Sequence, residues 1–526
     1  MCITNLEKIH LDVYRDSWID AIYQDGHVEK LSLRDCLVQA KNIKSLDIFD
    51  ANYALDKTVP YTLLTMILGR VFYPSDSDKL VMLANSDGFD MEPIDLYIEE
   101  CDGKSISFDV FDEHHPFLQD WEYQTRQEAK KDKKKVDMTS IGILDPLMVS
   151  GNNTVFYHNK NYDTGGNPVQ DILFMTPPQY IASVARNHMY HNPSGQSCGT
   201  GYSPSQPPLH CIIHGKNLFE TLVISIPNNL CGVPLWERKY DMTVPEIVDQ
   251  YEDLDYISAA FLPTTSIRFG KIENGMVKNI FYNGNIYKGK DKEKPKEYAS
   301  LFYGKGKTGM HLLIKDMKKK NGTEPTPIRM GDSADFTSTK LQIMQNFDST
   351  NNREFIKTAI RKGLLKGPFQ FTIYGGKLAG TVAGVGVEPQ SMLLNIPFPM
   401  ALLNNDVCQY VKGIAAYVEV ASVLLLKALL KLEKDIQNGE EVKASGAVRT
   451  ITRHFSEYAC DQLTENKLVH DTWLEQIIQN PTDEKKQKII ELIQDKVMES
   501  YYSYRTKYIL SSAKYAAQLQ RELRKI

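Results

Sequence analysis

The spacing of apolar residues changes at about Met392, and this change limits the possible folds more than any other feature. From Met392 onward, apolar residues recur at i, i+3, i+4 and i+7, which places them on one face of an α-helix. Helices with such stripes must bury them against one another. The pattern therefore predicts a C-terminal helical bundle of four helices, with one stripe formed by Val411, Ala415, Val418, Ser422 and Leu425.

Turn residues mark the expected ends of these helices. Asn438-Gly439 ends the first, Asn480-Pro481 separates the third from the last, and Thr482 or Asp483 caps the last. The last helix is expected to run from about Glu484 to Ile526. This helix contains four tyrosines, Tyr501, Tyr502, Tyr504 and Tyr508. We interpret them as packing residues within the bundle, and the alternative is a docking face for a partner subunit.

The first part of the chain has a different pattern. Strand-like pieces at Leu11–Tyr14 and His27–Leu31 accompany a helix over Val59–Phe72. Residues 150–390 are rich in Gly, Pro, Asn and Tyr, which predicts strands joined by long loops. At 526 residues the chain exceeds what one core usually supports. We expect an α+β fold, with a mixed α/β N-terminal domain over residues 1–390 and the helical bundle over residues 391–526.

Composition narrows the class of protein. The formal net charge is −5, so nucleic-acid binding would have to come from local patches. The 8 cysteines contain no CxxC pair, which favours a reducing cytoplasm over a disulfide framework or a zinc ribbon. Glu419 and Lys427 interrupt the longest apolar run, Val418–Leu432, which predicts a buried helix rather than a membrane span. No signal peptide is recognisable, and we expect a cytoplasmic protein.

Several local patterns resemble catalytic motifs, but each lacks a required part. His188 and His191 form HxxH near two cysteines, without the glutamate of HExxH or a known ligand spacing. The run GKGKTG at 304–309 has Leu301 where a Walker A loop needs glycine. The pair His114-His115 beside Asp112 favours a structural turn over a catalytic pair. The GxSxG motif of serine hydrolases does not occur. None of these patterns makes a positive case for an active site, a metal site or a cofactor site.

Two glycine-rich segments and several basic runs are better candidates for binding. The segment NPSGQSCGTGYSPSQ at 192–206 leads directly into an apolar run, so its C-terminal end is anchored. The segment GGKLAGTVAGVGVE at 375–388 suits either a loop that enters a minor groove or a tight β-hairpin. Basic runs at 126–135, 288–296 and 318–320 suit either phosphate contacts or solvated loops.

The order of several further motifs carries a family resemblance. They are DSWIDAIYQDGHVEKLSLRDCL at 16–37, HHPFLQ at 114–119, PLHCIIHGKNLFETLVISIP at 208–227, AAFLPTTSIRF at 259–269, IYGGKLAG at 373–380 and TRHFSEYA at 452–459. In this order they resemble the CasA family, the large subunit of the type I-E CRISPR surveillance complex Cascade. The resemblance extends over almost the whole chain.

The resemblance implies a specific function. Large subunits of this family are non-catalytic, so the resemblance implies no enzymatic activity, and we expect no metal and no cofactor. They recognise the short motif that flanks the target in duplex DNA, the PAM, from the minor-groove side. They help to start strand separation and R-loop formation, and they recruit a helicase-nuclease for antiviral defence. The implied partners are double-stranded target DNA, that helicase-nuclease and the crRNA-bound Cascade subunits, namely the backbone, small and crRNA 5′-end-binding subunits.

The resemblance also implies site residues. The family's DNA-reading glycine loop falls on Ser194, Gly195, Ser197 and Gly199, with serines at two family glycines. Its wedge hairpin falls on Gly375, Gly376, Lys377, Ala379, Gly380 and Thr381, where Thr381 replaces a glutamine at the tip. The minor-groove lysine is Lys288 or Lys290, and the loop that contacts crRNA and the backbone subunit contains Phe156, His158 and Asn159.

Two other functions remain open from the sequence. A metal-dependent nuclease would use His188 and His191 with nearby acids. A pure assembly scaffold would need no DNA-reading loop. Which PAM is read, and whether cleavage uses a separate enzyme, are not encoded in any motif of this chain.

Overall fold

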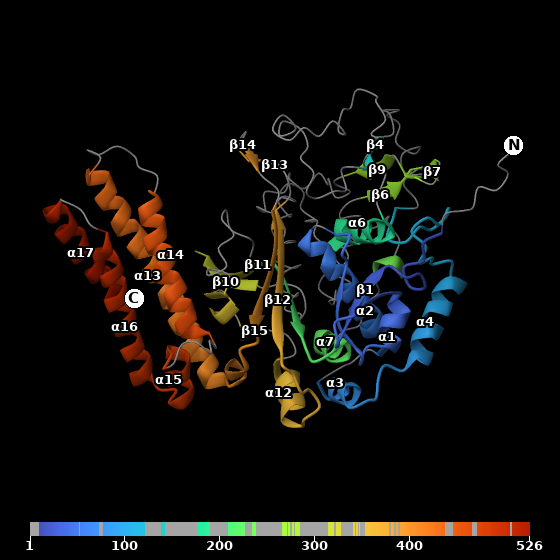
Figure 1. The fold of residues 1–526 in the computed structure, drawn as a ribbon, viewed down its shortest axis with the longest axis horizontal. Helices are drawn as coiled ribbons and strands as arrows, with labels where there is room; N and C mark the ends of the chain where they lie inside the picture. Colours follow the sequence, from blue (N-terminus) through green and yellow to red (C-terminus); the bar gives the residue numbers. More distant parts are fainter. Residues whose placement is uncertain are drawn as a thin grey trace. The chain divides into compact units, whose positions relative to one another are not determined.

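The chain forms two compact units in the computed structural model (Figure 1). Unit 1 comprises Met1–Met330 and Glu354–Phe398, and unit 2 comprises Gly331–Arg353 and Pro399–Ile526. The structure describes residues 10–51, 53–72, 77–120, 138–141, 176–189, 209–226 and 234–237, then 266–283, 314–327, 340–347 and 353–436 with short gaps, and finally 445–464, 471–504 and 508–526.

The N-terminal part of unit 1 is a small antiparallel sheet with the strand order β2-β1-β3. β1 (Ile19–Tyr23) turns at Gly26, whose φ of 89° favours glycine, into β2 (Val28–Leu31). Ser32 caps α1 (Leu33–Val38), and β3 (Ile43–Asp47) pairs with the other side of β1. The predicted strand at 27–31 is thereby confirmed as β2.

The predicted strand at Leu11–Tyr14 is wrong. Asp12 makes only an isolated bridge with Asp109, and the chain then turns. The carboxylate of Asp12 accepts hydrogen bonds from the backbone N–H groups of Tyr14 and Arg15, both at 2.8 Å. An aspartate that bonds its own downstream backbone in this way favours a turn over a strand.

Helices cover the small sheet. The predicted helix over Val59–Phe72 is confirmed as α2, which follows the 3₁₀ helix η1 (Ala54–Thr58) and is buried along most of its length. Buried helices of this kind are apolar all round rather than on one stripe. The other helices of this region are α3 (Ser77–Ala84), α4 (Met91–Gly103), α6 (Pro177–Met189), α7 (Leu218–Ser225) and the 3₁₀ helix η6 (Leu235–Glu237).

A second sheet of unit 1 has the order β15-β12-β5, with β12 in the centre. β12 (Gln370–Lys377) pairs antiparallel with both β15 (Gln390–Pro397) and β5 (His210–His214). Between β12 and β15 the chain forms a further strand pair, β13 (Gly380–Val382) with β14 (Val385–Val387). β5 therefore joins a hairpin that lies about 160 residues later in the sequence.

The remaining described elements of the N-terminal region are short. β9 (Asn279–Asn283) lies between β4 (Met138–Ser140) and β6 (Ser266–Phe269) in a third sheet. The others are the pair β7 (Ile272–Glu273) and β8 (Met276–Val277), the pair β10 (Ile314–Lys319) and β11 (Gly322–Pro327), and α12 (Arg353–Arg361).

Unit 2 is helical, as predicted, but the helical pattern expected from Met392 begins only at Met400, because Gln390–Pro397 form β15 of unit 1. Its central helix is α13 (Asn405–Ile436), which packs against α14, α16 and α17. By length and composition alone α13 could cross a membrane, but its apolar stripe is the core of this bundle. The other described helices of the unit are η8 (Met400–Leu403), α14 (Gly446–Leu463), α15 (Trp473–Gln479), α16 (Asp483–Ser503) and α17 (Ile509–Leu523).

The expected single helix from Glu484 to the C-terminus is wrong, because α16 ends at Ser503 and α17 begins at Ile509. One helix over that range would be about 65 Å long at 1.5 Å per residue, against about 48 Å for α13. Its second apolar stripe would therefore extend beyond the core. Two helices place both stripes on α13, and Thr482 caps α16 as predicted by accepting from Lys485 N at 3.3 Å.

The four tyrosines of this region divide into two groups. Tyr501 is buried and its hydroxyl donates to Ser512 O at 3.0 Å, which ties α16 to α17. The Tyr504 hydroxyl donates to Glu433 Oε1 at 3.1 Å. Both belong to the bundle, as the packing interpretation expects. Tyr502 and Tyr508 are exposed, and a docking role for them stays a prediction.

Candidate nucleic-acid interface

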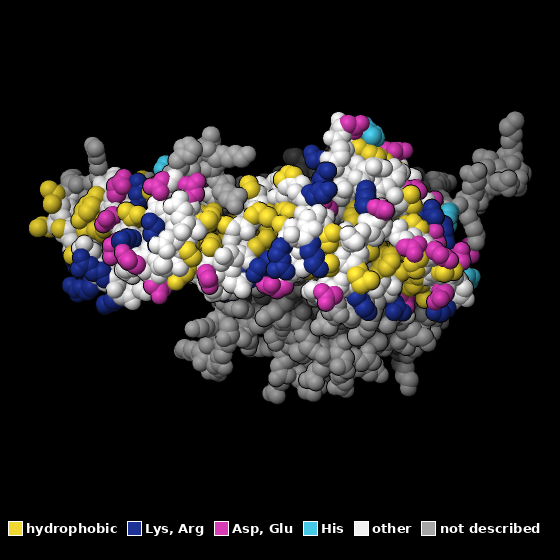
Figure 2. Space-filling model, turned by 90° about the horizontal axis from the view of Figure 1, so that it is seen from below, with side chains coloured by type: hydrophobic (Ala, Val, Ile, Leu, Met, Phe, Trp, Pro, Cys, Tyr) yellow, Lys and Arg dark blue, Asp and Glu magenta, His cyan; other side chains and the backbone are white. Residues whose placement is uncertain are grey.

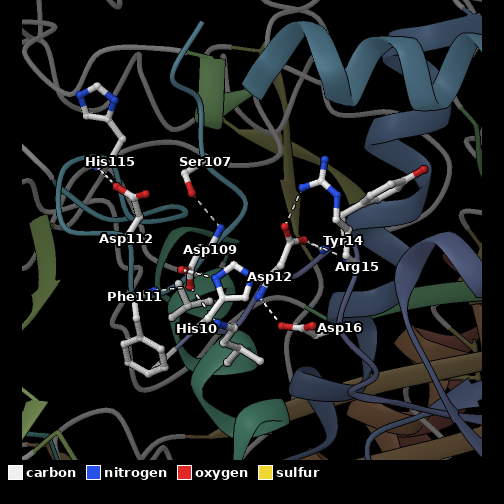
Figure 3. A network of polar contacts seen from close by, with 12 residues as sticks. His10, Asp12, Tyr14, Arg15, Asp16, Ser107, Asp109, Phe111, Asp112 and His115 are labelled. Atoms are coloured by element: carbon white, nitrogen blue, oxygen red, sulfur yellow. Dashed lines mark hydrogen bonds and ion pairs between the residues drawn. The ribbon is translucent and has the colours of Figure 1, made fainter. Parts of the chain in front are cut away.

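The motif HHPFLQ lies in a loop that the N-terminal segment holds in place (Figure 3). Asp109 Oδ1 accepts hydrogen bonds from the N–H groups of Leu11 and Phe111, both at 2.9 Å, and Asp109 Oδ2 lies 2.7 Å from His10 Nδ1. This carboxylate raises the pKa of His10. Asp112 Oδ1 in turn accepts from the N–H groups of His114 and His115. The histidines thus start a structural turn, as expected.

Gln119, the last residue of this motif, joins the loop to the third sheet. Its side-chain Nε2 donates to Val110 O at 2.6 Å, and its Oε1 accepts from Phe269 N at 2.8 Å. The side chain is 1% exposed, so both ends of the amide are satisfied inside the protein. Asp120 N continues the pairing by donating to Ile267 O at 2.8 Å. The motif therefore acts as a clamp on β6.

Replacing Gln119 by alanine is expected to lower the free energy of unfolding by about 2 kcal/mol, because it leaves a buried N–H and a buried C=O unpaired. Urea unfolding followed by circular dichroism measures this change. Gln24→Ala is the matched control, since the Gln24 amide donates to Lys216 O at an exposed site; it should cost less than about 0.5 kcal/mol. Equal costs for the two variants would contradict the clamp.

The motif HGKNLFETL ends β5 and starts α7. Asn217 caps the helix by accepting from Glu220 N at 2.9 Å, and Thr221 Oγ1 accepts from Gly215 N at 3.0 Å. The buried Glu220 carboxylate accepts from Lys216 N and from Lys366 N, at 3.0 Å and 3.2 Å. Side chains of this motif therefore fix both the sheet and the segment that leads into β12.

Two candidate DNA-reading segments are attached to the same end of the second sheet. His210, the first residue of β5, pairs with Tyr374, near the C-terminal end of β12. Because β5 and β12 are antiparallel, the segment that precedes β5 and the hairpin that follows β12 leave the sheet at the same end. The first of these segments contains the predicted glycine loop, and the second contains the predicted wedge. Residues far apart in the sequence are thus anchored side by side.

The hairpin is longer than the sequence indicated. Lys377 pairs with Gln390, and three residues further on Gly380 pairs with Val387, so both strand pairs keep one register. The ladder ends with Val382 opposite Val385. The hairpin alternative for this segment is therefore the correct one. Thr381 of β13 pairs with Gly386 of β14. It therefore lies in an arm of the hairpin and not at the tip, where the family pattern places this position.

Gly375 and Gly376 lie inside the sheet. A Cβ atom at Gly375 would meet Leu209 Cδ2 at 2.5 Å and Met392 Cε at 2.9 Å. A Cβ atom at Gly376 would meet the Tyr53 ring at 2.3 Å. Real Cβ atoms do not approach other atoms this closely, so a side chain at Gly375 would displace the ends of the Leu209 and Met392 side chains, and one at Gly376 would displace the Tyr53 ring. The absence of side chains at these two glycines lets neighbouring residues pack closely against the base of the hairpin.

The other predicted site residues are placed as follows. Lys377 ends β12, and Gly380 and Thr381 lie in β13. Outside the described residues lie Ser194, Gly195, Ser197, Gly199, Lys288, Lys290, Phe156, His158, Asn159 and Ala379, together with His191 of the nuclease alternative. His188 lies in α6, and their roles all stay predictions. Among the described residues, Asp, Glu, His and Cys form no cluster of three that could hold a metal.

Charge on the described surface is mixed. Lysine and arginine side chains are interspersed with aspartate and glutamate on the face shown in Figure 2, in keeping with a net charge of −5. The described cysteines are buried and form no disulfide with one another, and burial raises the pKa of the Cys101 thiol to about 11. A thiol with such a pKa is protonated and unreactive at neutral pH.

Comparison with known proteins supplies the family. The model of the family described as CRISPR-associated protein Cse1 matches residues 12–333. This match covers more than half of the chain. The chain belongs to the Cse1 family. The resemblance to CasA, which is another name for Cse1 in the solved structures, is thereby confirmed. No curated protein sequence matches the chain.

Solved Cse1 structures share the fold across nearly the whole chain. The crystal structure of Cse1 from Acidimicrobium ferrooxidans is 14% identical, covers 98% of this chain and 99% of its own, and has a TM-score of 0.58. Thermobifida fusca Cse1 is 14% identical, with 98% coverage of each chain and a TM-score of 0.60. A chain of a CRISPR RNA-guided surveillance complex has the same identity, covers 98% and 99%, and has a TM-score of 0.63.

Sequence reasoning missed the residues that support the hairpin. Tyr53, Leu209 and Met392 surround the glycine pair, and no local pattern links Tyr53 to a strand more than 300 residues later. The signal that was available is the glycine pair itself. Glycine within a strand often marks a close approach by another group. The identity of that group required the tertiary structure.

Proposed function

We propose that this Cse1-family chain is the non-catalytic large subunit of a type I-E Cascade complex. It reads the PAM in duplex DNA from the minor-groove side and starts strand separation for R-loop formation. It then recruits the helicase-nuclease that degrades the target in the cytoplasm. Its other partners are the crRNA-bound backbone, small and 5′-end-binding subunits.

The observation that carries this proposal is that the segment before β5 and the hairpin after β12 leave the second sheet at the same end. The segment with Ser194 to Gly199 and the hairpin β13–β14 are attached to neighbouring strands, so one stretch of duplex can contact both. Backbone N–H groups in a glycine-rich loop suit a narrow minor groove, where large side chains do not fit. A two-stranded ribbon that projects from the sheet suits insertion at the first base pair to open. Family membership and the fold shared with a surveillance-complex chain support this reading.

The test is a binding series with the reconstituted complex, in which only the bases that flank the target vary. With the native chain, affinity is expected to depend on these bases. Replacing residues 194–199 and residues 380–387 by Gly-Ser sequences of equal length should remove that dependence. Retained dependence in the doubly replaced complex would refute the proposed site. A scaffold would instead lose complex assembly, which gel filtration of the same variants detects.

The lysine candidates have a separate signature. Reversing Lys288 and Lys290 to glutamate should weaken binding to all flanking sequences alike and flatten the salt dependence of affinity, since phosphate contacts release counterions. Reversal of the exposed Lys79 and Lys104 in the same unit is the charge-matched control. A change in base preference, rather than a uniform loss, would contradict a phosphate role.

The nuclease alternative has its own assay. A catalytic chain would cleave DNA in the presence of divalent metal, and His188→Ala with His191→Ala would abolish the cleavage. The purified chain is expected to leave both single-stranded and duplex DNA intact.

A further inference from the structure

The base of the hairpin is held by a residue from the other end of unit 1. Tyr53 lies just before η1, is 2% exposed and packs against the backbone of β12 at Gly376. Three atoms of the Tyr53 side chain would lie between 2.3 and 2.6 Å from a Cβ atom at Gly376. The aromatic ring therefore occupies the space that any other residue at this position would fill.

The next residue holds the opposite arm at the same rung. Ala54 N donates to Ser391 Oγ at 2.7 Å, and Ser391 is the partner of Gly376 in the β12–β15 ladder. One rung away, Leu209 and Met392 close on Gly375, whose side chain would point to the opposite face. Contacts on both faces of the hairpin therefore hold its two arms at these neighbouring rungs.

This place is where the hairpin leaves the sheet. Pairing between β5 and β12 ends at Tyr374, whereas β12 and β15 continue to pair up to Lys377 and Gln390. Beyond Tyr374 the hairpin is a two-stranded ribbon, and ribbons of two strands twist strongly and have little stability alone. The direction of such a ribbon depends on what fixes its first free rungs. Here those rungs are Gly375 with Met392 and Gly376 with Ser391.

We propose that Tyr53 is a positioning residue for strand separation: its ring, with the Ala54–Ser391 hydrogen bond, sets the direction in which the hairpin enters the DNA. This inference rests on the proposed function, because it assumes that the hairpin opens the duplex. Tyr53 itself does not contact DNA. It acts through β12, so its loss affects the opening step and spares contacts made after the strands have separated.

The test uses the full crRNA-bound complex and two targets. One target is fully paired, and the other carries mismatches at the first base pairs beside the flanking motif, so that it is already open. A 2-aminopurine beside the motif reports strand separation. Tyr53→Ala and Gly376→Ala are each expected to slow opening of the paired target about tenfold or more. Binding to the pre-opened target should change less than twofold.

Matched variants separate positioning from general damage. Tyr53→Phe keeps the ring and should open the paired target at nearly the native rate. Gly103→Ala adds a Cβ atom to open space and serves as the control for Gly376→Ala. Ser391→Ala removes the acceptor of Ala54 N at an exposed position, so it tests the same rung if Gly376→Ala does not fold.

The outcomes distinguish this inference from the proposed function. Equal losses on the paired and the pre-opened target, or native opening by both Tyr53→Ala and Ser391→Ala, would overturn the positioning role and leave the proposed function standing. Native opening after replacement of residues 380–387 would instead overturn the proposed function of the hairpin. A selective loss on the paired target, restored by Tyr53→Phe, supports the inference.

Discussion

Replacing Trp18 by alanine is expected to lower the free energy of unfolding of unit 1 by about 4 kcal/mol. Trp18 is 0% exposed, just before β1, and its indole Nε1 donates to Val13 O at 2.9 Å. Truncation removes the largest side chain of this core and leaves both a cavity and an unpaired carbonyl. Urea unfolding at constant pH, followed by circular dichroism, measures the loss.

Two variants show which part of the indole matters. Trp18→Phe keeps an aromatic ring but removes the donor, so its cost should be clearly smaller than that of alanine, at about 1 to 2 kcal/mol. Phe49→Ala truncates an aromatic ring that is 54% exposed and should cost less than about 0.5 kcal/mol. If Trp18→Ala were no costlier than Phe49→Ala, the packing described around β1 would be incorrect.

Acid is expected to destabilise unit 1 well before its carboxylates are protonated, because β5 carries two neutral histidines, the buried His210 and the partly buried His214. Burial lowers the pKa of His210 to about 3 and that of His214 to about 4. Their ordinary value is 6.5, so the unfolded chain binds protons between pH 6.5 and these lower values while the folded chain does not. Stability is therefore complete above pH 6.5 and decreases as the pH falls, by about 2 kcal/mol for each histidine at pH 5.

Urea unfolding at pH 7.5, 6.5, 5.5 and 5.0 tests this expectation, and His210→Leu serves as the variant. Leucine cannot be protonated, so the free energy of unfolding of this variant should fall between pH 6.5 and 5 by about half as much as that of the native chain. His10 titrates with the opposite sign, because its pKa is raised by Asp109, but its side chain is 61% exposed and its contribution is small. An identical pH dependence in native chain and variant would show that His210 is not the titrating group.

Local patterns predicted those elements whose burial agrees with their own periodicity. Val59–Phe72 is a helix because a continuous apolar run of that length fits the middle of a core, and β2 follows a glycine turn. The strand expected at Leu11–Tyr14 failed where the side chain of Asp12 competed for backbone donors. The prediction of one long last helix was wrong for a different reason. Its apolar residues keep helical spacing, but α13 is too short to pack against a single helix of that length, so the chain folds back and forms α16 and α17.

The candidate site was predictable only in part. The glycine-rich composition of residues 375–388 predicted either a loop that enters a groove or a β-hairpin, and the family resemblance indicated a hairpin in that segment. The pairing of β5 with β12, which places the start of β5 and the base of the hairpin at one sheet end, joins residues about 160 positions apart. Nothing in the local sequence of either strand specifies its partner, because the hydrogen bonds of a ladder use backbone groups that all residues share.

The sequence by itself determined the class of fold, the helical nature of the C-terminal region, the cap at Thr482 and the membership of the chain in its family. These depend on side-chain periodicity and on motifs that act over a few residues. Only the tertiary structure decided that HHPFLQ is a clamp on β6, that Thr381 lies in an arm of the hairpin, and that Tyr53 fills the space beside Gly376. Each of those results depends on which distant segment closes a gap in the packing, and packing is a property of the whole core.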